Sequence, residues 1–323
     1  EDVRRSNLAT LLRYVHLHGP TSRSLLTSEL RLNRSTIGDL TSGLAAAGLV
    51  REEVGPPPGA RTSGGRPSHV VVPQTEAVQV LAVDIGVSHL TIARVGLGGV
   101  ILDRRDLHQH PGHRAVEEVA EVVAAASREL LASLPPGARC VGAGAAVPGL
   151  VRASDGLVRH APNLGWVDVP LGERLSRALG VPVAVGNDAD VGALAEHSRG
   201  VAVGCDDLVY LAGHAGIGAG VFMDGHPVSG HRGYAGEVGH IRVNPHGADC
   251  RCGSSGCWET EAGEERLLAL AGRPAHGGLE AVREVVAAAA AGEEPARKAL
   301  REVATWLGVG TAAVVNLLNP QMV

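Results

Sequence analysis

The chain has 323 residues, of which 45% are hydrophobic and only 2% aromatic, and its formal net charge is −5. This length suits two or three domains, whose cores must be built mainly from Leu, Val and Ala. The negative net charge excludes a general attraction to nucleic acid, so any contact with DNA would need a local basic patch. No apolar run has the length of a membrane span and no signal peptide opens the chain, which predicts a cytoplasmic protein with no membrane partner.

Residues 1–73 are predicted to form a winged helix-turn-helix. Apolar residues recur at helical spacing over 3–17, and capping residues introduce two further helices over 21–30 and 34–47. The short turn between the second and third helices is typical of a helix-turn-helix. Two expected strands between residues 49 and 72 enclose a loop rich in Pro, Gly and Arg, which we interpret as a wing.

The start of the third helix and the wing carry the candidate DNA contacts. Small hydrogen-bond donors and guanidinium groups contact phosphates and base edges, and wing arginines can enter a minor groove. The candidates are Asn33, Arg34, Ser35, Thr36, Arg61 and Arg66. This interpretation requires the acidic Asp39, Glu52 and Glu53 to point away from DNA. A helical docking module with a flexible hairpin is the alternative.

From residue 79 onward the pattern is that of an α/β layered fold. Three strands between residues 80 and 107 are followed by a helix over 115–131 and a strand over 140–147. Residues 213–220 form a glycine-rich segment that we interpret as a turn after a strand over 208–211. Two more helices are expected, over 277–291 and 295–316, and Asn319-Pro320 should end the second of them.

Asn187 and Asp188 follow a buried strand that begins at Val181. In open α/β sheets the ends of such strands face a cleft where ligands bind. Asn and Asp at a strand end are also ordinary turn formers. This segment alone therefore leaves a binding site and a simple turn as two open interpretations.

The stretch 236–259 holds a compact group of metal-ligand side chains. Thiolate sulfur and imidazole nitrogen are the ligands that a tetrahedral structural zinc prefers. The candidate ligands are His240, Cys250, Cys252 and Cys257. Gly253 and Gly256 allow the backbone to curl so that the three sulfurs face one point. The alternative, a disulfide with a spare thiol, leaves one of three clustered thiols unpaired, so we predict one Zn²⁺.

The same stretch resembles a known family signature. Gly-Glu-Val-Gly-His starting at Gly236, followed by Cys-x-Cys-Gly-x-x-Gly-Cys-x-Glu ending at Glu259, is similar to the signature of the ROK family of repressors and sugar kinases. The resemblance implies a two-lobed actin/hexokinase-like (ribonuclease H-like) ATPase fold with a zinc-braced sugar pocket. It implies sugar contacts from Asn163, Asn187, Asp188, Glu237, His240 and Glu259.

Two loops that bind phosphate in the kinases of this family differ here. The kinases have Asp-x-Gly-Gly-Thr-Lys where this chain has Val, Ser and His at positions 87–89. In the second loop Ala215 stands at a threonine position and Ala219 at a glycine position. A β-branched side chain where the backbone must approach a phosphate is a steric objection to ATP. Asp188, in contrast, retains the position of the kinase general base.

Together these features predict a sugar-responsive DNA-binding regulator, a repressor of carbohydrate metabolism genes, with no catalytic activity. It should bind an inverted repeat in operator DNA as a homodimer or homotetramer. The alternative is an ATP-dependent, glucokinase-like hexose kinase with an accessory N-terminal domain. We expect three domains: a DNA-binding domain over 1–73, a first lobe over 74–195, and a second lobe over 196–323 that is truncated at its C-terminus.

Overall fold

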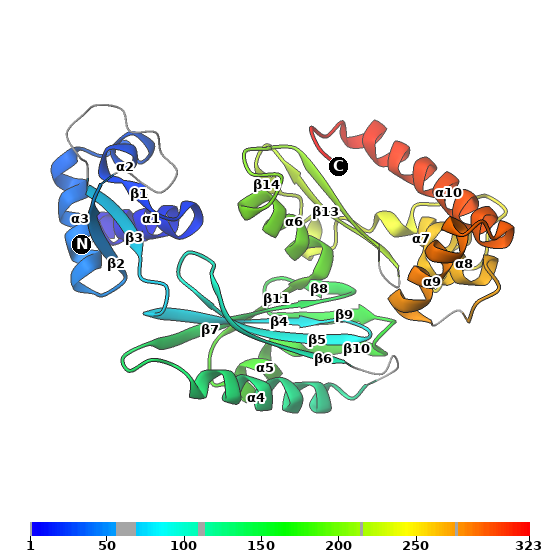
Figure 1. Ribbon diagram of the computed structural model, residues 1–323, viewed down its shortest axis with the longest axis horizontal. Helices are drawn as coiled ribbons and strands as arrows, with labels where there is room; N and C mark the ends of the chain where they lie inside the picture. The colour runs from blue at the N-terminus through cyan, green and yellow to red at the C-terminus, as the bar shows by residue number, and fades with distance from the viewer. Residues whose placement is uncertain (1, 56–68, 109–113, 214–215, 275–276) are drawn as a thin grey trace.

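The structure is a computed structural model, and it describes residues 2–323 except 56–68, 109–113, 214–215 and 275–276. An N-terminal module lies at one end of the molecule, α/β layers form the middle, and a group of helices lies at the other end (Figure 1). Among the described residues, no helix is long and apolar enough to cross a membrane.

The helices and the two expected strands of the N-terminal module are those predicted for a winged helix-turn-helix, whereas the expected wing loop lies outside the described residues. The elements of the module are α1 (Asp2–His18), β1 (Thr21–Ser22), α2 (Arg23–Glu29), α3 (Arg34–Ala46), β2 (Val50–Val54) and β3 (His69–Pro73). Ser22 and Asn33 cap α2 and α3 through side-chain oxygens that accept from backbone N–H groups, as their positions predict. The sequence pattern missed β1, which pairs with β3 and completes a sheet of order β1-β3-β2. Leu11, Val15 and Ile37 are completely buried in the core of this module.

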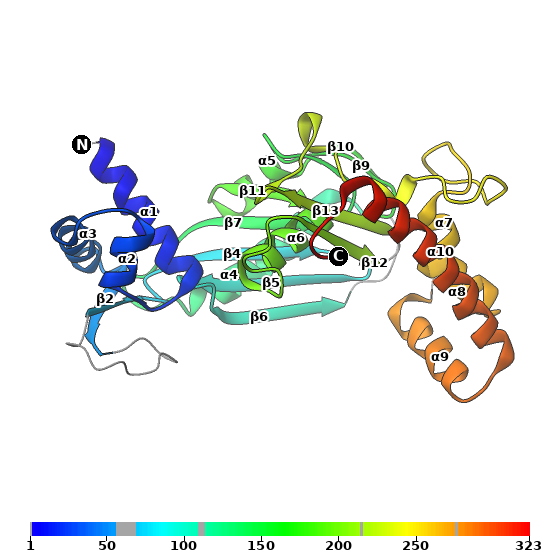
Figure 2. The same cartoon turned by 90° about the horizontal axis from the view of Figure 1, so that it is seen from above.

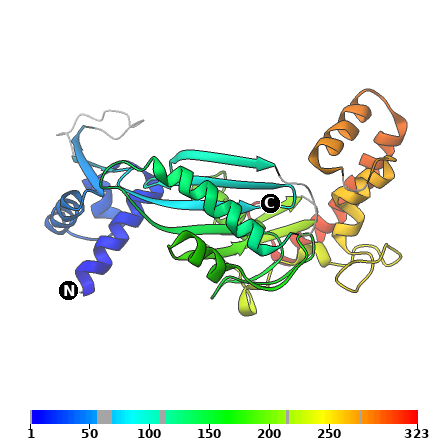
Figure 3. The same cartoon turned by 90° about the horizontal axis from the view of Figure 1, so that it is seen from below.

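A five-stranded sheet of order β11-β7-β4-β5-β6 forms the first lobe. Its strands are β4 (Val78–Ile85), β5 (His89–Gly96), β6 (Ile101–His108), β7 (Arg139–Val147) and β11 (Val183–Asn187). The antiparallel meander β4-β5-β6 confirms the prediction, and β7 runs parallel to both β4 and β11. Helices α4 (Val116–Ala132) and α5 (Leu171–Leu179) cover one face of this sheet, the face toward the viewer in Figure 3.

A second, smaller sheet in the first lobe was not predicted. It consists of β8 (Leu150–Arg152), β9 (Leu157–Ala161) and β10 (Trp166–Pro170), paired antiparallel in chain order. These strands have three to five residues, which is too short for a hydrophobic period to be visible in the sequence.

Helix α6 (Asp188–Arg199) follows β11 directly and lies between the two lobes (Figure 1). It packs mainly against β12 (Leu208–Gly213) and β13 (Ile217–Met223) of the second lobe. The expected domain boundary after residue 195 falls inside this continuous helix, and the three-domain division stays a prediction.

Only part of the glycine-rich segment 213–220 is the turn that we predicted: the chain reverses between Gly213 and Ile217, which pair in an antiparallel hairpin, and the remainder is strand. Residues 217–220 belong to β13, and Gly218 and Gly220 pair with β12 in regular antiparallel register. A Cβ atom on Gly220 would lie 2.5 Å from Ala189 O in α6. These glycines therefore allow α6 to pack closely on β13. In the sequence, glycines needed for such packing look the same as glycines that form a turn.

The second lobe continues through β14 (His226–Pro227), two short 3-10 helices, η1 (His231–Gly233) and η2 (Val238–His240), and four α-helices. The α-helices are α7 (Trp258–Ala262), α8 (Glu264–Leu270), α9 (Gly278–Ala290) and α10 (Glu294–Leu318). The predicted α9 and α10 are confirmed, and Asn319 ends α10 in the left-handed conformation. The sequence pattern missed the short α7 and α8.

Candidate functional site

The four predicted metal ligands converge on one point. Their ligand atoms all lie within 4.8 Å of one another. His240 Nδ1 is 3.6 Å from Cys250 Sγ, and Cys252 Sγ is 3.6 Å from Cys257 Sγ. Two sulfurs each about 2.3 Å from a tetrahedral zinc lie roughly 3.8 Å apart, so this spacing fits the ion.

Buried packing holds the loop that carries these ligands. Gly256 has φ +66°, and a Cβ atom there would lie 1.7 Å from Asn244 O, so only glycine fits. The Glu261 side chain is 2% exposed and accepts hydrogen bonds from Asn244 Nδ2 and Ala248 N. Trp258, fully buried, packs against Gly310 of α10. The ligand loop is therefore anchored on both sides.

The thiols of this cluster have unequal proton affinities. Burial raises the pKa of Cys250 to about 12 and also raises the pKa of Cys257. A backbone hydrogen bond from Ser254 lowers the pKa of the exposed Cys252. Zinc binds the thiolate form of cysteine. Its positive charge would offset the cost of ionising the two buried thiols.

His240 has a geometry that fits both of its predicted roles, because its two ring nitrogens face different groups. Nδ1 faces the sulfur of Cys250, whereas Nε2 lies 3.7 Å from Glu237 Oε2. A metal-bound histidine commonly directs its second nitrogen toward a carboxylate, which fixes the ring. The two roles predicted for His240 are therefore compatible in geometry.

The predicted sugar contacts come from both lobes. Asn187 is the N-cap of α6, and its Nδ2 donates to Gly149 O at 3.0 Å in the first lobe. Glu259 follows the last metal ligand in α7, where its Oε1 lies 3.5 Å from His240 Nδ1. The charges of Glu259 and Asp188 both raise the pKa of Glu237, in addition to the larger effect of burial. The three carboxylates are therefore close enough to interact electrostatically.

Two polar residues that interact with these predicted contacts were missed in the sequence. Burial, followed by the charges of Glu237 and Asp188, raises the pKa of Asp190 to about 6. Arg251 stands in the sequence between the predicted metal ligands Cys250 and Cys252. Its Nη1 donates to Asn163 Oδ1 at 2.7 Å, and this hydrogen bond joins the ligand loop to the first lobe. The sequence signal for Asp190 is its position in the first turn of the helix that follows Asn187. Nothing in the sequence pairs Arg251 with a residue 88 positions away.

Asp190→Asn is expected to raise the melting temperature, more at pH 8 than at pH 5. The folded-state pKa of Asp190 is raised, so its stabilising contribution is complete below the ordinary value of 3.8 and is lost as pH rises through about 6. A pKa shift of this size corresponds to a change of about 3 kcal/mol in the free energy of unfolding, and screening by solvent reduces this to about 1 kcal/mol. Thermal unfolding at both pH values measures the difference. The exposed Asp206→Asn is the control, and a lower melting temperature of the Asp190 variant at pH 8 would contradict the assignment.

A histidine lies against the first predicted phosphate-binding turn. His89 Nε2 lies 3.0 Å from Asp84 Oδ2, and Gly86 N donates to His89 O. A Cβ atom on Gly86 would lie 2.1 Å from the His89 ring, so the imidazole lies directly against this glycine. In the second predicted phosphate loop, Ala215 lies outside the described residues, whereas Ala219 is a buried residue of β13.

Part of the predicted DNA-binding surface is described. Arg34 and Ser35 are exposed at the start of α3, whereas Asn33 Oδ1 accepts from Ser35 Oγ and Thr36 N as a cap. Asn33 therefore has only its Nδ2 group left for a ligand. Arg61 and Arg66 lie outside the described residues.

Of the three acidic residues that must point away from DNA, two are paired with arginines. Glu52 forms an ion pair with Arg23, and Glu53 pairs with Arg51 at 2.7 Å. Burial raises the pKa of Glu52, but the hydrogen bonds from Arg23 and Thr41 outweigh it and hold that pKa below its usual value. The two ion pairs reduce the negative potential of this surface and also occupy the positive charges of Arg23 and Arg51. Asp39 is exposed on α3.

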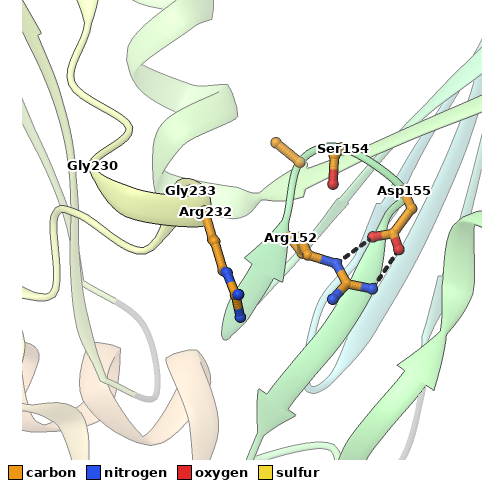
Figure 4. Close-up of a pocket in the computed structure, with 7 residues that line it drawn as sticks. Arg152, Ser154, Asp155, Gly230, Arg232 and Gly233 are labelled. Atoms are coloured by element: carbon orange, nitrogen blue, oxygen red, sulfur yellow. Dashed lines mark hydrogen bonds and ion pairs between the residues drawn. The ribbon is translucent and has the colours of Figure 1, made fainter.

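A cavity of about 520 Å³ lies between β8 of the first lobe and η1 of the second (Figure 4). Arg152 on its wall pairs with Asp155 at 2.5 Å, and Arg232 has a left-handed backbone conformation with φ +63°. The predicted sugar contacts are not among its lining residues.

The known proteins that are similar to this chain belong to one family and include both repressors and sugar kinases. The family model described as "ROK family" matches residues 80–323. The xylose repressor of Caldicellulosiruptor bescii is 30% identical, over 94% of this chain and 78% of that protein.

Two solved structures separate the regulatory and enzymatic relatives. A ROK family transcriptional regulator described as a homologue of the E. coli MLC protein matches with a TM-score of 0.78, 29% identity and coverage of 100% of this chain and 83% of that one. A ROK family glucokinase from Streptomyces griseus, in complex with glucose and AMPPNP, matches with a TM-score of 0.62, 30% identity and coverage of 75% and 80%. The regulator match therefore includes the N-terminal module, whereas the kinase match leaves a quarter of the chain uncovered.

Proposed function

The chain belongs to the ROK family, and on this basis we propose that it is a sugar-responsive transcriptional repressor of carbohydrate metabolism genes. The observation that supports this best is the full-length match to a ROK transcriptional regulator, which includes the winged helix-turn-helix. The carboxylates and amides that face the cleft are suited to accept hydrogen bonds from vicinal hydroxyls of a sugar. We infer that Zn²⁺ bound by the four clustered ligands holds the loop of Glu259 rigid.

Selection of DNA fragments from a random library, followed by a sugar titration, tests this proposal. We expect the full chain to enrich an inverted repeat whose half-sites lie one or two helical turns apart, bound by a homodimer or homotetramer. D-xylose and D-glucose are the first sugars to test, because a xylose repressor and a glucose-bound kinase are among the relatives. Failure to enrich any DNA would contradict the proposal.

Arg34→Ala is expected to reduce the salt dependence of operator binding. Each neutralised phosphate contributes about −0.9 to the slope of log affinity against log salt, so a dimer that loses two contacts should change by about two units. Fluorescence anisotropy at several salt concentrations measures the slope. Arg283→Ala on α9 removes another exposed arginine, at the opposite end of the molecule from the module, and should leave the slope unchanged. An unchanged slope for Arg34→Ala would remove the start of α3 from the interface.

A hexose kinase is the second candidate, because Asp188 retains the general-base position and glucokinases share the fold. The imidazole of His89 over Gly86 argues against it, since phosphate would need that space. We therefore expect no ADP release with ATP, Mg²⁺ and either sugar in a coupled assay. Turnover that Asp188→Asn abolishes would instead favour the kinase.

A further inference from the structure

Three segments that are distant in sequence meet at the guanidinium group of Arg199, the last residue of α6. Arg199 Nη2 donates to His16 O in the last turn of α1, at 2.8 Å. Its Nη1 donates to Gly98 O in the turn between β5 and β6, also at 2.8 Å. Gly98 N in turn donates to His16 Nδ1 at 3.1 Å, which closes the group. One side chain thus joins the DNA-binding module, the first lobe and α6.

The surroundings of Arg199 are adapted to this contact. The last carbonyls of a helix have no partner within the helix and carry partial negative charge, so a cation there is favourable. A planar guanidinium can donate to two separate carbonyls at once, which an ammonium group does less well. A side chain on Gly99 would clash, because its Cβ atom would lie 2.5 Å from Arg199 Cζ. Burial, followed by the charge of Arg199, lowers the pKa of His16, which favours the neutral ring whose Nδ1 can accept.

The other end of the same helix forms part of the sugar cleft. Asn187 caps α6 and Asp188 begins it, and the helix extends 12 residues to Arg199 without interruption. At 1.5 Å per residue the two ends are about 17 Å apart. The helix packs on β12 and β13, so it belongs mechanically to the second lobe, whereas Gly98 belongs to the first (Figures 1 and 2). A rotation of one lobe against the other about an axis away from this contact would therefore displace Arg199 relative to Gly98.

We propose that Arg199 is the positioning residue that transmits sugar binding to the DNA-binding module. This inference rests on the proposed function. Without sugar, Arg199 holds the end of α1 against the β5–β6 turn and keeps the module in its operator-binding orientation. When the lobes close on a sugar, α6 moves as a rigid body, and the two hydrogen bonds of Arg199 can no longer be made together.

Arg199→Ala in the full chain tests the inference by the ratio of operator affinities without and with saturating sugar. Allosteric ratios are typically about 5- to 150-fold, and we expect the variant ratio to fall below about twofold. Sugar affinity measured without DNA should stay within about threefold of the parent, because Arg199 does not contact the cleft. The probes are the selected operator fragment and whichever of D-xylose and D-glucose binds more tightly. A ratio within twofold of the parent ratio would overturn the inference.

Two further variants separate coupling from general damage. Arg177→Ala on α5 removes an exposed arginine that pairs only within its own helix turn among the described contacts, and it should keep the parent ratio. Arg199→Lys retains the charge but not the planar fork, so it should restore the ratio only in part. Full restoration by lysine would show that charge alone, and not the double contact, couples the two parts.

Hydrogen exchange at Gly98 N tests the contact without any ligand. This amide donates to His16 Nδ1, so Arg199→Ala should accelerate its exchange at least about tenfold, a loss of protection expected when the local hydrogen bond opens. Unchanged exchange would overturn the inference even if the ratio changed. If the parent chain binds neither DNA nor sugar, the proposed function fails, while the exchange measurement still decides whether Arg199 holds the module.

Discussion

Cys257→Ser is expected to abolish zinc binding and to weaken sugar binding by at least about a hundredfold. A structural zinc in a small domain contributes roughly 10–16 kcal/mol of binding free energy, and serine cannot replace a thiolate ligand. Cys257 is completely buried and is the N-cap of α7, which carries Glu259. Loss of the metal should therefore release Glu259 and His240 from the cleft together.

Metal analysis and sugar calorimetry on the same preparations measure both effects. The parent chain should contain one zinc per chain, and less than half an equivalent would contradict the metal site. Cys252→Ser changes an exposed ligand, so it should lose zinc without creating a buried defect. Cys140→Ser changes a thiol outside the cluster and should retain the zinc and the sugar affinity of the parent. A Cys257→Ser protein that loses zinc but binds sugar normally would separate the metal from the cleft.

Asp188→Asn is expected to raise the sugar concentration at the midpoint of operator release by about ten- to a hundredfold. A hydrogen bond to a charged acceptor contributes roughly 1.5–3 kcal/mol, and an amide cannot fully replace a carboxylate. Effector and operator share one coupling free energy, so weaker sugar binding must shift the midpoint by the same factor. Operator affinity without sugar should stay within about threefold, a difference under ~1 kcal/mol.

Anisotropy of a labelled operator across a sugar titration measures both quantities in one experiment. Asp224→Asn in the turn between β13 and β14 is a matched control and should leave the midpoint unchanged. A midpoint that does not move in Asp188→Asn would mean that this carboxylate does not contact the effector. The sugar contacts implied by family resemblance would then fail at their central residue.

The sequence by itself determined the features that depend on neighbouring residues. Capping side chains such as Ser22 and Asn33 act within three positions, so the helices of the module could be located from them. The three cysteines and glycines of the metal loop lie within eight positions, which makes their ligand geometry a local property. The family signature lies in the same stretch, and it implied the fold and the function class.

Only the tertiary structure decided the features that join distant segments. Gly218 and Gly220 belong to a strand because α6 must approach it, although in the sequence they suggested a turn. The strands β8 to β10 are too short to show a period and are stable only through their pairing. The contacts of Arg251 with Asn163 and of Arg199 with His16 connect residues 88 and 183 positions apart. No local pattern specifies such pairs, because the packing of α6 and of the two lobes brings them together.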